Sequence, residues 1–133
     1  MFTAQIKMDI HKNYDLKFVN LKVNYGTRVE KSVHGITVAG ESFSPLSEYL
    51  YLLGHYKAID DVLIEINAAL AGQAFNDGIE VGTETITLTQ SNTTIINSDG
   101  RTQTIPTTDL KAIILEYKTF LNTPPLDGSF VSN

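Results

Sequence analysis

The spacing of the apolar residues changes several times along the chain, and this constrains the fold more than any other feature of the sequence. Between residues 2 and 39, apolar and polar side chains alternate, which predicts β-strands. Helical spacing follows from 44 to 72, alternation returns between 84 and 105, and helical spacing resumes from 107 to 121. This order predicts an α+β fold, with antiparallel β meanders packed against a long central helix and a C-terminal helix.

The N-terminal region predicts a meander of antiparallel strands. Its first strand runs from Phe2 to Ile10, with apolar side chains at the even positions. The second begins near Tyr14, and its apolar residues move from even to odd positions. This change predicts a β-bulge near Phe18–Asn20. A third strand is expected within Arg28–Ala39.

The central helix has strong end signals and one weak point. Ser44 is a favoured N-cap, Pro45 suits the first helical position, and Gly72 is a favoured C-cap. Gly54 lies in the interior, where glycine costs about 1 kcal/mol relative to alanine. The segment therefore forms either one long helix or two helices hinged near Gly54-His55, and we favour one helix that bends there.

The second half ends in another meander and a helix. Strands are expected at 84–89, 93–97 and 101–105, and Asp99-Gly100 predicts a hairpin turn. Thr107 or Thr108 is expected to cap the last helix, which presents one apolar stripe. A chain of 133 residues suits a single domain, which we place at residues 1–125, with a loose tail at 126–133.

Composition and motifs exclude several classes of protein. Cysteine is absent, which rules out thiolate nucleophiles, disulfides and cysteine-ligated metals. The sequence holds no Gly-x-Ser-x-Gly elbow, phosphate-binding loop or dinucleotide-binding glycine motif. No apolar run reaches the ~18 residues of a membrane span, and the N-terminus does not resemble a secretory signal. We therefore expect a cytoplasmic protein that is not an enzyme, with no cofactor and no membrane contact.

The histidines leave one alternative open. The three histidines, His11, His34 and His55, fall on different predicted elements and lack the spacing of a helical metal site. We therefore expect no metal site, and we interpret His11 as a solvated turn residue. The alternative is a small, metal-independent enzyme that uses His11 or His55 with an acidic neighbour.

The charge is unevenly distributed. Residues 1–40 hold six basic and three acidic side chains, a net +3, whereas residues 41–133 hold four basic and twelve acidic ones, a net −8. An acidic domain repels phosphates, which disfavours direct binding to nucleic acid and favours a basic protein partner. The residues that we predict to bind this partner are Tyr51, Asp60, Asp61, Glu65, Asp77, Glu80 and Glu84.

Four segments carry a resemblance to known proteins. They are SPLSEYLYLL at Ser44–Leu53, INAALAG at Ile66–Gly72, ITLTQSNTTII at Ile86–Ile96 and IPTTDLKAIILEYKTFL at Ile105–Leu121. Over residues 44–121 the chain resembles small bacterial immunity proteins of polymorphic-toxin and contact-dependent growth-inhibition systems. The resemblance implies an inhibitor that binds one cognate toxin, of which nucleases are one class, without catalysis. It transfers no binding residue to this sequence, and a non-inhibitory adaptor or scaffold protein remains a second alternative.

Overall fold

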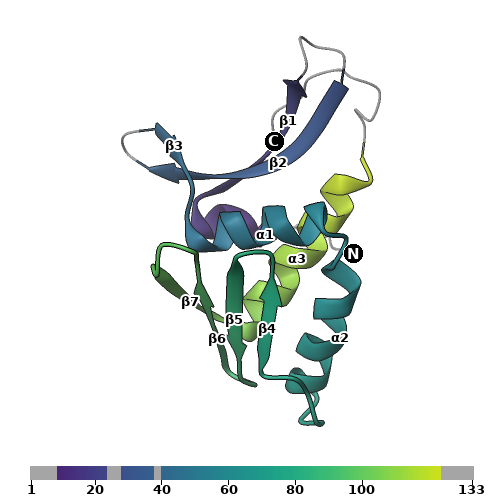
Figure 1. Ribbon diagram of the computed structural model, residues 1–133. Coiled ribbons are helices and arrows are strands. Elements are labelled where there is room, and N and C mark those ends of the chain that lie inside the picture. The colour runs from purple at the N-terminus through teal and green to yellow at the C-terminus, as the bar shows by residue number, and fades with distance from the viewer. Residues whose placement is uncertain (1–8, 24–27, 38–39, 124–133) are drawn as a thin grey trace, which may run out of the picture.

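The computed structural model describes residues 9–23, 28–37 and 40–123. These residues form two antiparallel sheets and three α-helices, which confirms the predicted α+β class and the C-terminal helix (Figure 1). The predicted strand Phe2–Ile10 and the predicted tail lie almost wholly outside the described residues. Ile10, the last residue of that strand, instead begins a 3₁₀ helix, η1 (Ile10–Tyr14).

The first sheet has the strand order β1-β2-β3. Its strands are β1 (Leu16–Val23), β2 (Arg28–Thr37) and β3 (Gly40–Ser42). Because β1 and β2 pair continuously from Leu16–Gly35 to Val23–Arg28, the prediction of a β-bulge is wrong. The apolar residues shift from even to odd positions for another reason: β1 is buried on both faces. Phe18 and Asn20 are buried on one face, and Val19 is buried on the opposite face.

The predicted central helix is two helices, α1 (Pro45–His55) and α2 (Ile59–Leu70), so the prediction of one bent helix is wrong. The break follows from Lys57, whose φ of 55° lies in the left-handed region. There the amide of Lys57 donates to the carbonyl of Gly54, and the amide of Ala58 donates to the carbonyl of Leu53. This is the hydrogen-bond pattern of a Schellman C-cap, and it stops α1 one turn before α2 begins.

The other helix boundaries follow the local signals. The Ser44 hydroxyl accepts from the amide of Ser47, and the Ser47 hydroxyl accepts from the amide of Ser44, so a reciprocal cap starts α1. At the end of α2, Gly72 has a φ of 72°, and its amide donates to the carbonyl of Ala69. Both predicted caps are confirmed.

The second sheet has the order β4-β5-β6-β7. Its strands are β4 (Gly78–Val81), β5 (Glu84–Leu88), β6 (Asn92–Ile96) and β7 (Thr102–Pro106), and α3 (Thr107–Leu121) follows. The N-cap of α3 is Pro106, so the prediction of a cap at Thr107 or Thr108 is wrong. The last three strands match the predicted meander, whereas β4 is a strand that the sequence analysis did not predict. The turn at Asp99-Gly100 is confirmed: the Asn97 side-chain oxygen accepts from the amides of Asp99 and Arg101, and Gly100 has a φ of 81°.

Helix α1 lies between the two sheets (Figure 1). It contacts β2 on one side, β4 to β7 on the other, and α3 as well, whereas α2 packs beside the four-stranded sheet against α3. Gly54 permits the contact with α3, because a Cβ atom there would lie 3.2 Å from the Tyr117 hydroxyl and 3.4 Å from Leu121. One apolar cluster, with members from both sheets and all three α-helices of the described residues, forms the core.

Replacing Lys57 by glycine should raise the free energy of unfolding by up to about 1 kcal/mol. An L-residue in the left-handed region is strained by about 1–2 kcal/mol, and glycine removes this strain at a smaller entropic cost in the unfolded chain. Urea denaturation measures the change, with Lys57→Ala as the control that keeps the strain. A glycine variant no more stable than the alanine variant would contradict the left-handed cap.

Candidate functional site

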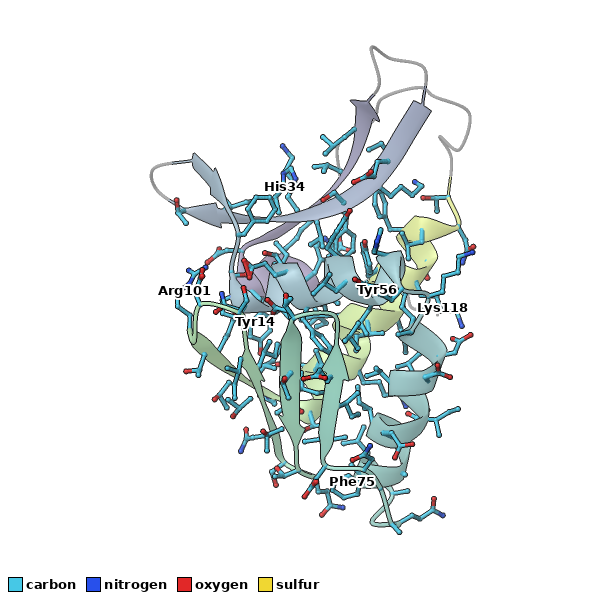
Figure 2. All side chains as sticks on the ribbon, viewed as in Figure 1. Tyr14, His34, Tyr56, Phe75, Arg101 and Lys118 are labelled. Carbon is cyan, nitrogen blue, oxygen red and sulfur yellow. The ribbon has the colours of Figure 1, made fainter. Side chains whose placement is uncertain are left out.

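Two acidic residues of α3 hold η1 in place. Asp109 and Glu116 lie two turns apart on α3 and therefore project from the same side of the helix. The hydroxyl of Tyr14, at the end of η1, donates to Asp109 at 2.5 Å (Tyr14 is labelled in Figure 2). Burial and the Asp109 carboxylate raise the pKa of Tyr14 to about 12, so this donor keeps its proton at neutral pH.

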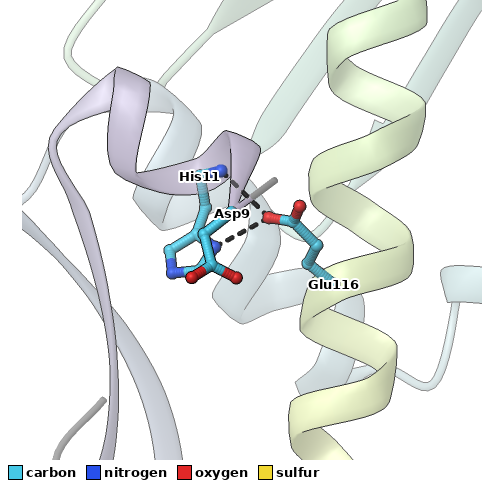
Figure 3. A group of neighbouring side chains, drawn as sticks. All are labelled: Asp9, His11 and Glu116. Carbon is cyan, nitrogen blue, oxygen red and sulfur yellow. Dashed lines mark hydrogen bonds and ion pairs between the residues drawn. The ribbon is translucent and has the colours of Figure 1, made fainter. Parts of the chain in front are cut away.

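Glu116 binds the first turn of η1 through three hydrogen bonds. The backbone amides of Ile10 and His11 donate to its carboxylate at 2.8 and 2.9 Å. The third bond joins the His11 Nδ1 to the Glu116 Oε1 at 2.7 Å (Figure 3). Because a carboxylate accepts the Nδ1 proton, a neutral His11 imidazole carries its free lone pair on Nε2.

His11 is only 5% exposed, so its interpretation as a solvated turn residue is wrong. Its ring stacks on Phe18, with 4.0 Å between the ring centroids and 17° between the planes. The Nε2 atom is buried, and it has no hydrogen-bond partner among the described residues. An unpaired buried polar atom costs about 1–3 kcal/mol, which makes this nitrogen a candidate ligand-binding atom.

A cavity of about 370 Å³ lies beside this histidine. It is lined by Asp9, His11, Lys12, Phe18, Leu115, Glu116, Thr119, Phe120 and Thr123. Asp9 places its carboxylate alongside the imidazole, and one ligand atom each of Asp9, His11 and Glu116 lies within 4.8 Å of the other two (Figure 3). The three residues therefore form a cluster of metal-ligating groups at a cavity, which the sequence analysis did not find.

The two hydroxyl groups in the lining of the cavity bond to the backbone and not to His11. The hydroxyls of Thr119 and Thr123 donate to the backbone carbonyls of Leu115 and Phe120. His55, the other histidine of the enzyme alternative, is exposed and contacts the rings of Tyr51 and Tyr56. Neither histidine thus forms a hydrogen bond to a hydroxyl nucleophile within the described residues.

The structure places two of the predicted partner-binding residues on the outward side of α2. Asp60 and Asp61 are both exposed in its first turn. The Asp60 carboxylate pairs with the Lys118 amino group of α3 at 2.7 Å (Lys118 is labelled in Figure 2). One turn further along α2, Ile64 is 62% exposed, and the sequence analysis did not single it out.

Three further residues lie around the other end of α2 and on the second sheet. Glu65 is half-buried, and its carboxylate accepts from the amide of Asn76 at 2.7 Å. Asp77 is exposed in the turn that follows. Glu80 is exposed on β4, where it pairs with Thr85 of β5. The predicted acidic residues are therefore spread over several elements and do not form one patch.

Tyr51 and Glu84 have structural contacts. Tyr51 is half-buried, and its hydroxyl donates to Glu30 of β2 at 3.1 Å. Glu84 is 2% exposed and lies in the core between β5 and α1, so we leave it out of any binding surface. Its alternation with Ile86 and Leu88 on β5 placed it on the buried face, and this was the signal available in the sequence.

Glu84 forms a carboxyl pair with Glu48 of α1. Burial, together with the hydrogen bond to Glu48 and the charge of Glu48, raises the pKa of Glu84 to about 7, and the backbone of Ser98 and the Arg101 guanidinium oppose this rise. Glu48 accepts from the Asn97 side chain at 3.1 Å and lies 4.0 Å from Arg101. Glu48 thus has the cationic and amide partners, and Glu84 holds the proton.

Glu84 should contribute stability that is lost as the pH rises from about 4.5 to about 7. In this window the unfolded chain releases the Glu84 proton and the folded chain retains it, so the free energy of unfolding decreases. Glu84→Gln keeps a donor toward Glu48 and should remove this part of the pH dependence. Urea denaturation at either end of the window measures both proteins. An equal loss of stability in both would show that Glu84 ionises normally in the folded state.

Comparison with known proteins assigns no function to these residues. Within the described residues, no helix combines the length and the apolar character needed to cross a membrane. No protein-family model, curated protein or solved structure matches the chain.

Proposed function

We propose that the chain is a protein-binding module that neutralises a basic bacterial toxin, in the manner of an immunity protein. The observation that carries the proposal is the α2 outer face, which we define as Asp60, Asp61, Ile64 and Asn67. Ile64 has the largest exposed fraction of the large apolar side chains among the described residues. It lies one turn from two carboxylates, so an apolar anchor and an acidic rim share one helix face.

The two parts of the α2 outer face have different physical roles. Burying an isoleucine side chain in an interface contributes about 1.5–3 kcal/mol, whereas rim charges mainly accelerate association. Asp60 already pairs with Lys118, and Asp61 forms no ion pair within the described residues. Asp61 is therefore the more available of these two carboxylates to a basic partner.

A hollow beside this face offers room for a side chain of the partner. It has a volume of about 220 Å³ and is lined by Gly54, Lys57, Ile59, Asp60, Lys118, Leu121 and Asn122. Interface anchors commonly occupy such pockets next to an exposed apolar residue. A basic side chain in this hollow would compete with Lys118 for the Asp60 carboxylate.

The distribution of charge supports a basic partner. Residues 41–133, which include α2, carry a net charge of −8. Nucleases hold phosphate backbones with basic clefts, and an acidic surface that covers such a cleft excludes the substrate. A nuclease toxin is thus the partner class that we favour.

Co-expression tests the proposal and separates an inhibitor from an adaptor. A toxin domain encoded beside the gene is expressed in bacteria with and without this chain, and the two purified proteins are mixed on a sizing column. Rescue of growth together with a stable complex supports the proposal. A complex without rescue favours the adaptor, and the absence of any complex contradicts both.

Ile64→Ser should weaken binding to that toxin domain by about 10-fold to 100-fold, because it removes the apolar anchor. Ile96→Ser is the matched control, since Ile96 is 36% exposed but lies on β6, away from α2. Calorimetric titration gives both affinities. If the two variants bound equally well, the interface would not include the α2 outer face.

Asp61→Lys should slow association with the basic toxin domain and flatten its dependence on salt, with little change in dissociation. Asp99→Lys is the control, because Asp99 is an exposed acidic residue of the β6–β7 turn. Stopped-flow mixing at low and high salt measures the rates. An association rate that Asp61→Lys leaves unchanged at low salt would place the electrostatic contact elsewhere.

A further inference from the structure

We propose that Asp9 and His11 bind a divalent transition-metal ion such as Zn²⁺ at the cavity between η1 and α3, with Glu116 as the residue that orients the imidazole. The inference rests on the η1–α3 junction alone and is independent of the proposed protein partner. Imidazole nitrogen and carboxylate oxygen are both ligands that zinc accepts. Imidazole also favours a transition metal over Mg²⁺ or Ca²⁺, which prefer oxygen ligands only.

The hydrogen bond to Glu116 prepares His11 for coordination. Metal-binding histidines almost always donate their second ring N–H to a carboxylate, a carbonyl or water, which fixes the tautomer and the ring orientation. Here the Nδ1–Oε1 distance is 2.7 Å, and two backbone amides of η1 hold the same carboxylate in place. The stacked Phe18 ring fixes the plane of the imidazole.

The unpartnered Nε2 atom of His11 is the second observation that supports a metal site. Nε2 is buried and unpartnered within the described residues, although the other ring nitrogen has a short hydrogen bond. A metal ion at Nε2 would provide the missing partner, and a carboxylate oxygen of Asp9 lies within 4.8 Å of a ring nitrogen of His11. The Asp9 carboxylate also contacts the Lys12 amino group at 3.2 Å, an exposed ion pair that a metal ion can displace at low cost.

The cavity leaves the remaining coordination positions open. Two protein ligands do not complete a tetrahedral zinc site, and about 370 Å³ of space beside them admits water or a small anionic ligand. An open site of this kind binds metal exchangeably. The sequence predicted no metal site because the spacing of the three histidines does not match one. Glu116 lies 105 residues from His11, so the spacing of nearby residues gives no sign of their contact.

Zinc titration of the chelator-treated full chain tests the proposal. Calorimetry should show one ion per chain. Long-range ¹H–¹⁵N spectra should show a shift at Nε2 of His11, while Nδ1 keeps the signature of a protonated nitrogen. Asp9→Asn should lower the affinity at least 10-fold, and Glu116→Gln should lower it by about 10-fold to 100-fold, as expected for an orienting carboxylate.

Two variants separate binding at His11 from binding elsewhere on the protein. His55→Gln removes an exposed histidine and should leave zinc binding unchanged. Asp9→Asn carries the test because Asp9 is only half-buried, whereas a change at His11 also removes its stacking on Phe18. Circular dichroism verifies that each variant is folded. The proposal is overturned if zinc leaves the His11 resonances unchanged, if Asp9→Asn binds zinc like the wild type, or if His55→Gln abolishes binding.

Discussion

The burial of α1 between the two sheets is the constraint on which the other contacts depend. Its residues Leu46, Tyr49, Leu50 and Leu53 are 0% exposed, and it contacts both sheets and α3. A helix enclosed on several sides needs a small residue where another helix passes close by, which explains Gly54 beside Tyr117. The left-handed cap at Lys57 then ends α1, so that α2 can pack against α3.

This arrangement leaves α3 as the element that links both candidate sites. Glu116 faces η1 and holds the His11 imidazole, and Lys118, two residues later, pairs with Asp60 of α2. The apolar side of the same helix, which includes Ile113, Ile114 and Tyr117, lies in the core. A helix anchored in the core by its apolar side thus positions the proposed metal site and one carboxylate of the proposed interface, so each site rests on a rigid element.

The features that the sequence predicted are those that local interactions determine. The Ser44 cap, the Asp99-Gly100 turn and the apolar stripe of α3 each depend on residues close in sequence. The features that were missed depend on contacts between distant residues. Glu116 and His11 are 105 residues apart in the sequence. The left-handed residue that ends α1 is Lys57, where the sequence has no glycine to indicate a C-cap. Charge alone did not separate exposed Asp61 from buried Glu84, and only the alternation of Glu84 with Ile86 and Leu88 marked the face of β5 that packs against α1.

Native-state hydrogen exchange of the free protein tests most directly whether α1 unites the molecule. If both sheets depend on α1, the slowest amides of β1, α1, β5 and α3 should open with one common free energy, equal to that of global unfolding. They should also share one dependence on denaturant, because they would be exposed in the same event. A three-stranded sheet that opened at a distinctly lower free energy, with α1 and the four-stranded sheet still protected, would contradict the account.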